Sequence, residues 1–349
     1  MRKRCSARHW PPARQLAFVT EQVSESVDRA AALLRAGELV AFPTETVYGL
    51  GADASNPVAL TRIFSAKGRP ADHPLIVHIA DVSQLEQWAR EISEAAVKLA
   101  DYFWPGPLTL ILKRQPQVND LVTGGQDTIG LRVPNHPLAL QLLQAFGSGI
   151  AAPSANRFGR ISPTTSQHVR DELGEAVSLI LDGGSCAVGI ESTIVDMSRG
   201  EAVILRPGMI GAEQIAHVLG NDAASLDDRH SRESGNQVSA KPRVSGSLES
   251  HYAPTTPMWL VAGSVIKAEI NRRLSSGQQV AALSHQTLAN NPHLRWLQTS
   301  DQNEKYAHDL YANLRILDQV GADIILVEMP PKTGSWRAIN DRLQRAAEK

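Results

Sequence analysis

Cysteine is scarce in this 349-residue sequence, which contains only Cys5 and Cys186. Two thiols cannot build a disulfide framework or a four-cysteine zinc site, and such scarcity is typical of proteins in a reducing compartment. No apolar run approaches the roughly 18 residues that a membrane helix needs. The basic N-terminus also lacks the apolar stretch of a secretory signal. We therefore expect a cytoplasmic protein that has no membrane partner and holds no metal ion of its own.

The motifs that most often carry phosphate or hydrolytic chemistry are absent as well. The sequence contains no G-x-x-x-x-G-K-[ST], no H-E-x-x-H, no paired C-x-x-C and no G-x-S-x-G. Its formal net charge is −1, so the chain as a whole is not an electrostatic binder of nucleic acid. Any anion site must therefore be a local arrangement of Lys and Arg side chains.

Length and pattern predict two α/β domains. A chain of 349 residues is too long for one typical core. Alternating helical and strand patterns over 23–220 predict an α/β domain with a mixed sheet. The Ser-, Gly- and Asn-rich segment 221–257 predicts a linker, and 258–349 repeats strand and helix as in a smaller, doubly wound parallel domain. Residues 1–22 are expected to be a disordered basic tail.

Two predicted strands place a polar side chain opposite their apolar face. In the strand predicted over 75–79, the alternation of a β-strand puts His78 on the face away from its apolar neighbours. In the strand predicted over 129–133, Arg132 takes the same position. For either strand alone, a polar side chain in this position is explained equally well by an outer face exposed to solvent. Taken with the polar loops described next, the pair favours a concave binding face.

Three loops carry further candidates. Lys67 and Arg69 flank Gly68 at a predicted helix end, where a Lys also offsets the helix dipole and a Gly ends the helix. Two cations so spaced can share one polyphosphate. Ser154 and Asn156 follow a short apolar strand, where they could bind a ligand or simply cap a turn. The segment 43–51, with two close glycines, predicts a tight loop that lets the backbone approach a ligand.

Taken together, these segments resemble the YrdC-type family of threonylcarbamoyl-AMP synthases. The matching motifs occur in the family's order over about 23–220, and the HYAP at His251 with the segment after it resembles the longer, two-domain form. The motifs are PTETVYGLG from Pro43, AKGRP from Ala66, PLIVHI from Pro74, WPGPLT from Trp104, DTIGLRVP from Asp127, APSAN from Ala152, GIESTIVD from Gly189 and LRPG from Leu205.

The resemblance implies an activity. The family joins L-threonine, bicarbonate and ATP into threonylcarbamoyl-adenylate and releases pyrophosphate, for the threonylcarbamoyladenosine modification of tRNA. Mg²⁺ is implied as a companion of ATP. A downstream threonylcarbamoyl transferase complex is the implied protein partner, and no stable tRNA binding is expected. The implied fold is an open α/β sheet with a basic concave face.

The resemblance also implies site residues. Catalytic roles fall on Lys67 and Arg69, and the linker would fold over the site as part of a lid. His73 stands where the family often has Asn. Threonine is implied to lie against Thr46, His78, Arg132 and Ser192, and ATP against Arg69, His73, Thr128, Ala152, Ser154, Asn156, Ser162, Arg206 and Tyr252.

Two alternatives belong to other classes. A non-catalytic RNA-binding module could use the same basic concave face, but the near-zero net charge and the lack of an aromatic stacking platform argue against it. The carbamoyl-transfer enzyme of hydrogenase maturation shares this domain type. It requires zinc-finger cysteines and an acylphosphatase segment, and the sequence has neither.

Overall fold

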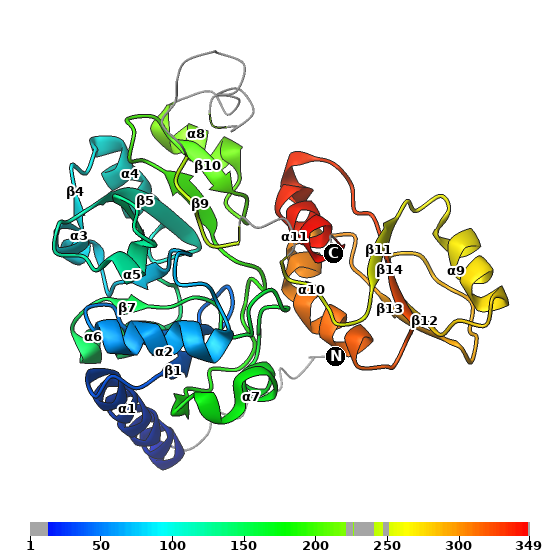
Figure 1. The fold of residues 1–349 in the computed structure, drawn as a ribbon, viewed down its shortest axis with the longest axis horizontal. Helices are drawn as coiled ribbons and strands as arrows, with labels where there is room; N and C mark the ends of the chain where they lie inside the picture. Colours follow the sequence, from blue (N-terminus) through cyan, green and yellow to red (C-terminus); the bar gives the residue numbers. More distant parts are fainter. Residues whose placement is uncertain (1–12, 221–225, 227–240, 247–250, 348–349) are drawn as a thin grey trace, which may run out of the picture.

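The computed structural model describes residues 13–220, 226, 241–246 and 251–347, with side chains from residue 24 onward. Two α/β units pack against each other (Figure 1). The helices of the first unit are α1 Ala13–Arg35, α2 Pro57–Lys67, α3 Leu85–Trp88, α4 Glu94–Phe103, α5 Asp120–Thr123, α6 Pro137–Phe146, α7 Ser166–Leu173 and α8 Ala212–Leu219. Its strands are β1 Val40–Phe42, β2 Gly49–Asp53, β3 Ile76–His78, β4 Ala89–Arg90, β5 Leu108–Arg114, β6 Thr128–Arg132, β7 Ile150–Ala151, β8 Leu179–Ile180, β9 Thr193–Asp196 and β10 Val203–Arg206.

The strands of the first unit form one mixed sheet in the order β10-β9-β5-β6-β3-β7-β2-β1-β8, with β4 paired to β5. β3 and β6 are parallel neighbours, and their register places His78 directly beside Arg132. Other pairs, such as β5 with β6, are antiparallel. The predicted mixed α/β sheet is thus confirmed, and its pairing brings two polar side chains from distant parts of the chain together.

The two faces of this sheet differ as the strand alternation predicts. The core contains the apolar residues of both strands, among them Val77 of β3 and Leu131 of β6. His78 and Arg132 lie on the opposite face, yet only 4% of each residue is exposed. This face is therefore not a solvated surface: other parts of the molecule cover it.

Local chemistry fixes where α2 ends. Asn56 caps the first turn by accepting hydrogen bonds from the backbone N–H groups of Val58 and Ala59, and Pro57 occupies the first helical position. Gly68 ends the helix with φ +62°, a left-handed conformation that glycine adopts without strain. After this turn, Arg69 lies on the same face of the sheet as His78.

The second unit is a smaller parallel sheet with helices on both faces. The strand order is β11-β14-β12-β13, all parallel. α9 packs on one face, and α10 and α11 pack on the other (Figure 1). The predicted doubly wound domain is confirmed. The elements are β11 Met258–Val261, α9 Ile266–Ser275, β12 Val280–Ser284, β13 Leu294–Gln298, α10 Asn303–Asp318, β14 Ile324–Glu328 and α11 Arg337–Ala347.

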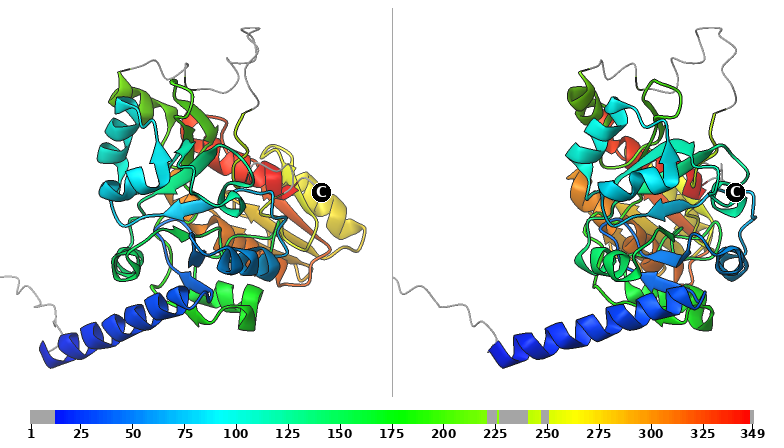
Figure 2. Two further views of the ribbon diagram at one scale, coloured as in Figure 1. Left: turned by 60° about the vertical axis from the view of Figure 1, so that its left-hand side comes forward. Right: turned by 90° about the vertical axis from the view of Figure 1, so that its left-hand side faces the viewer.

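Several local predictions are wrong. α1 begins at Ala13, inside the segment expected to be a disordered tail (Figure 2); residues 1–12 lie outside the described residues. The strand β13 is not among the predicted elements; it lies at the edge of the sheet, where Arg295 and Gln298 are exposed. Most of the predicted linker, 221–257, also lies outside the described residues.

The glycines of the segment 43–51 do not lie in a loop as expected, although Gly49 does line the cavity described below. Gly49 and Gly51 belong to the strand β2 rather than to a loop. A Cβ on Gly51 would lie 2.9 Å from side-chain atoms of Ile150 and Phe42. Glycine is therefore needed here for close packing of neighbouring strands.

Candidate active site

One narrow cavity collects most of the predicted site residues. It lies on the polar face of the large sheet, under residues of the linker, and holds only about 50 Å³ of space open to water. Nine predicted residues line it, drawn from eight separate segments of the first unit and the linker. They are Thr46, Arg69, His78, Arg132, Ala152, Ser154, Ser192, Arg206 and Tyr252.

Arg132 is fixed by three partners. Its Nη2 lies 2.7 Å from Glu45 Oε2, its Nη1 donates to Thr46 Oγ1 at 2.9 Å, and its Nε donates to the Gly106 carbonyl at 3.2 Å. Glu45 Oε2 also accepts from the backbone N–H of Asn135. The guanidinium is thus held in one orientation, with its charge balanced by a buried carboxylate.

His78 is a neutral side chain in this environment. Its ring packs edge-on against Phe42, with centroids 5.9 Å apart. Burial, and then the neighbouring charge of Arg132, lower the pKa of His78 to about 3. Its Nδ1 has no hydrogen-bond partner in the described part of the chain. The ring can therefore exchange a hydrogen bond with a ligand in the cavity.

Arg206 contacts Ser192 closely. Its Nε and Nη2 donate to the Ser192 carbonyl at 3.1 and 2.9 Å, and Nη2 also reaches Ser192 Oγ at 3.1 Å. Thr109 Oγ1 lies 2.8 Å from the same hydroxyl. The remaining nitrogen, Nη1, donates to the carbonyl of Ser245 in the linker.

Arg69 contacts the same linker residue. Its Nη2 donates to Ser245 Oγ at 3.0 Å and to the Pro74 carbonyl at 2.9 Å. Burial lowers the pKa of Arg69 to about 10, so the side chain remains charged at neutral pH. Among the described residues, neither Arg69 nor Arg206 forms an ion pair with a carboxylate. Two buried cations with only neutral oxygen partners make a site suited to an anion.

Tyr252 closes the cavity from the linker. Its backbone has φ +63°, an uncommon conformation for a bulky residue. Its hydroxyl is buried without a hydrogen-bond partner among the described atoms, and a Cβ on Gly246 would lie 2.2 Å from it. The neighbouring His251 also has an unpartnered buried Nδ1. These unpaired polar atoms face a cavity that a polar ligand could fill.

Five predicted residues do not line this cavity. Lys67 donates to the carbonyls of Ser154 and Asn156, so it supports the Ser154 loop instead of facing the cavity. The Asn156 amide donates to the carbonyls of Arg157 and Arg160, and the Ser162 hydroxyl donates to Glu191. The His73 ring packs on Phe158. Thr128 lines two adjacent hollows beyond the linker residue Ser245.

The ligands assigned from the sequence leave out several residues of the site. Thr44, Glu191, Ser245 and His251 line the cavity but were not among the assigned ligands. Glu191 directly precedes Ser192 in the motif GIESTIVD, so the assignment of Ser192 pointed to this part of the chain. Ser245 lies in a segment without periodicity, and nothing in the sequence pairs it with two arginines.

Carboxylates near the cavity are already engaged. Glu45 pairs with Arg132, and Glu191 accepts hydrogen bonds from Ser162, Tyr311 and Arg342. In the described part of the chain, no three His, Cys, Asp or Glu side chains gather as metal ligands. Each of the two cavity carboxylates is paired with an arginine, although Glu45 Oε1 has no hydrogen-bond partner among the described residues, and Mg²⁺ prefers carboxylate and phosphate oxygens. The described helices also include none that could cross a lipid bilayer.

Comparisons with known proteins identify the family of the chain. A family model described as "Telomere recombination" matches residues 32–208, and one described as "Threonylcarbamoyl-AMP synthase, C-terminal domain" matches residues 210–348. The curated threonylcarbamoyl-AMP synthase of Bacillus subtilis (strain 168) is 42% identical over 94% of this chain and 96% of its own length. That of Pyrococcus abyssi is 39% identical over the same shares.

Solved structures lead to the same family. The crystal structure of P. abyssi Sua5 complexed with L-threonine matches with a TM-score of 0.83 at 38% identity, covering 93% of this chain and 94% of that one. A variant of P. abyssi Sua5 matches with a TM-score of 0.84, covering 93% of each chain. The chain therefore belongs to the threonylcarbamoyl-AMP synthase family, in the form that carries the additional C-terminal domain.

Proposed function

We propose that this chain makes threonylcarbamoyl-adenylate from L-threonine, bicarbonate and ATP, and that the cavity beneath Tyr252 is where it does so. One observation carries the proposal. Arg69 and Arg206 are buried beside each other without a carboxylate partner among the described residues, next to the fixed cation Arg132. The arrangement leaves two positive charges for the phosphates of a nucleotide.

Threonine would occupy the end of the cavity at Thr46, His78, Arg132 and Ser192. Arg132, whose Nη2 has no hydrogen-bond acceptor among the described residues, would donate to the carboxylate of threonine, while Glu45 and Thr46 keep its guanidinium in place. His78 is neutral and therefore adds no competing charge. ATP would extend from this end past Arg69, Ser154 and Arg206, with the linker residues above it.

The reaction would proceed by positioning and charge stabilisation. The amine of threonine condenses with bicarbonate to form a carbamate and releases water, and an oxygen of this carbamate attacks the α-phosphorus of ATP. The bond to the bridging oxygen breaks, and pyrophosphate leaves with that electron pair. Arg69 and Arg206 would offset the charge on the phosphate oxygens. Tyr252 and the linker would exclude water, which protects the labile carbamate.

Mg²⁺ would arrive with ATP. Because the carboxylates at the cavity are engaged, the triphosphate oxygens and water would supply the ligands. The ion would offset phosphate charge when bound. Chelation of Mg²⁺ should therefore stop pyrophosphate release without lowering the melting temperature of the protein. A fall in melting temperature on chelation would instead indicate a metal site within the protein.

The setting of the activity is a further proposal. A labile adenylate needs a consumer, so a threonylcarbamoyl transferase complex acting on tRNA would take the product, and a cytoplasmic location suits this role. No stable tRNA complex is proposed, because the charged groups described here are buried in a narrow cavity. The RNA-binding alternative is not favoured by the family comparisons.

The direct test is pyrophosphate release from purified protein with threonine, bicarbonate, ATP and Mg²⁺. We expect release that requires threonine, and at least a hundredfold loss in the Arg69→Ala variant, since one buried phosphate-binding charge is removed. The exposed pair Arg62–Glu38 offers a matched control: Arg62→Ala should retain full activity. A folded sample that releases no threonine-dependent pyrophosphate would rule out the activity.

A further inference from the structure

A buried ionic cluster joins the two units directly behind the cavity. Arg342 of α11 donates from Nε to Glu191 Oε2 at 2.7 Å, and Tyr311 of α10 donates to the same oxygen at 2.9 Å. The side chain of Arg342 is fully buried, and 9% of the Glu191 side chain is exposed. Glu191 lines the cavity beside Ser192, so two residues of the C-terminal unit hold a wall of the site.

The same two residues also hold Tyr252. The Arg342 guanidinium lies over the Tyr252 ring, 5.2 Å from its centroid. The rings of Tyr252 and Tyr311 stack with centroids 5.7 Å apart and an interplanar angle of 27°. These contacts oppose the cost of the left-handed backbone at Tyr252, which persists only where its surroundings enforce it.

We infer that Arg342 and Tyr311 are positioning residues for the nucleotide end of the site. They place Tyr252 and Glu191 from the C-terminal unit, so that unit completes the cavity rather than serving as a separate module. Neither residue lines the cavity, and both act through residues that do. This inference deepens the proposed function and rests on it.

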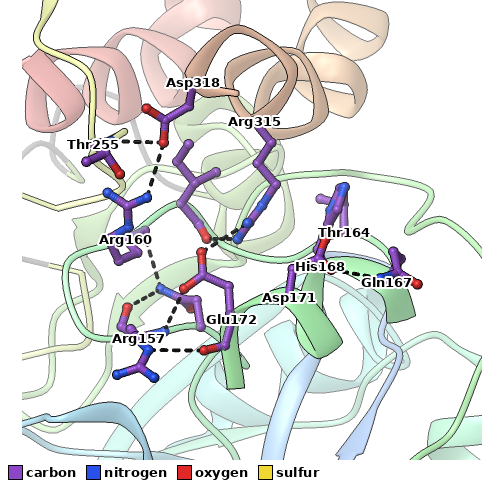
Figure 3. Close-up of polar contacts among 12 residues, drawn as sticks. Arg157, Arg160, Thr164, Gln167, His168, Asp171, Glu172, Thr255, Arg315 and Asp318 are labelled. Carbon is purple, nitrogen blue, oxygen red and sulfur yellow. Dashed lines mark hydrogen bonds and ion pairs between the residues drawn. The ribbon is translucent and has the colours of Figure 1, made fainter. Parts of the chain in front are cut away.

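The interface contains a matched pair away from the cavity. Arg315 of α10 donates from Nη1 to Glu172 of α7 at 3.0 Å, with 10% and 9% of the two side chains exposed. Figure 3 shows this pair beside Asp318, which accepts from Arg160 and from the backbone N–H of Thr255. Arg315 also donates to the Ile161 carbonyl, next to Ser162, so it joins the units as Arg342 does, but no contact of Arg315 with Tyr252 or Glu191 is seen in the described part of the chain.

The test compares Arg342→Met with Arg315→Met in the full-length protein. Both variants remove one buried interface cation, so both should lower the melting temperature. Partial unfolding lowers the apparent kcat but leaves KM unchanged, so a loss of stability alone should not affect KM. Only Arg342→Met should raise the KM for ATP, by at least fivefold. Arg342→Lys, which restores a charge beside Glu191 and Tyr252, should recover at least half of the lost kcat/KM.

Tyr311→Phe covers the case in which Arg342→Met does not fold. It removes only the hydroxyl that binds Glu191 and keeps the stacked ring, so we expect a stable protein whose kcat/KM is reduced at least threefold. Wild-type kinetics in Tyr311→Phe, or equal KM changes in Arg342→Met and Arg315→Met, would overturn the inference.

Binding of a non-hydrolysable ATP analogue, measured by calorimetry, separates this inference from the proposed function. If the wild-type protein binds the analogue and Arg342→Met binds it at least fivefold more weakly, the positioning role holds even where turnover is absent. If both bind equally while the wild-type protein turns over, the proposed function stands and the positioning role fails.

Discussion

Arg132 and Glu45 form an ion pair at 2.7 Å in which 5% and 7% of the two side chains are exposed. Arg132 comes from the strand β6, and Glu45 from the loop between β1 and β2. A buried charge without its partner is costly, so the pair fixes the loop onto the sheet. The same loop supplies Thr46, and the pair therefore shapes the threonine end of the cavity.

Replacing Arg132 with Lys should weaken threonine binding. Lys keeps a charge near Glu45 but loses the fixed fork that also reaches Thr46 and Gly106. We expect the KM for threonine to rise at least tenfold and stability to fall by about 1–3 kcal/mol. Steady-state pyrophosphate release at saturating ATP measures the first effect, and urea unfolding the second. An unchanged threonine KM would remove Arg132 from the threonine site.

Replacing Lys67 with Met should disturb the ATP site indirectly. The ammonium donates to the Ser154 and Asn156 carbonyls, and without it these two acceptors lose a buried partner. We expect a loss of about 1–3 kcal/mol in the free energy of unfolding and a higher KM for ATP. Lys98→Met, on an exposed face of α4, is the control and should change neither. A normal ATP KM in Lys67→Met would show that the loop holds its shape alone.

Removing the hydroxyl of Tyr252 separates a ligand contact from a structural one. Its oxygen is buried without a partner among the described atoms, so Tyr252→Phe should be as stable as the wild type or slightly more stable. If the hydroxyl contacts ATP, turnover should nevertheless fall several-fold. Tyr252→Ala should weaken turnover further and should also lower the melting temperature, because the buried ring packs against Tyr311 and Arg342. Thermal melting and steady-state kinetics on the same samples measure the two effects. Wild-type kinetics in both variants would mean that the linker only connects the two units.

His78 should make stability depend on pH. Burial lowers its pKa to about 3, whereas in the unfolded chain the group titrates near 6.5. Below pH 6.5 the imidazole of His78 binds a proton in the unfolded state but stays neutral in the folded state. The contribution of His78 to the free energy of unfolding is therefore complete above pH 6.5 and is lost as the pH falls toward 3. The slope is about 1.4 kcal/mol per pH unit.

Urea unfolding of wild type and His78→Asn between pH 5 and pH 6.5 measures this contribution. The variant should lose stability less steeply as the pH falls, because Asn does not titrate. His251, whose pKa burial also lowers to about 3, remains in both proteins and cancels in the comparison. Identical slopes would mean that His78 takes up a proton in the folded state.

The motifs of the sequence by themselves determined the family, the two α/β units and most of the cavity. Strand alternation placed His78 and Arg132 on the polar face, because side chains of a β-strand alternate regardless of what packs on them. The glycine end of α2 likewise determined where Lys67 and Arg69 leave the helix. These are local rules, and each acts within a few residues.

Only the tertiary structure decided which polar residues face the cavity. Asn156, Ser162 and Lys67 carry suitable side chains, but each is bound to a neighbouring acceptor instead. It also brought Arg342, 151 positions away along the chain, into contact with Glu191 in the cavity wall. The physical reason is that a buried polar group takes whichever partner folding brings within hydrogen-bond reach, and that choice depends on the packing of both units.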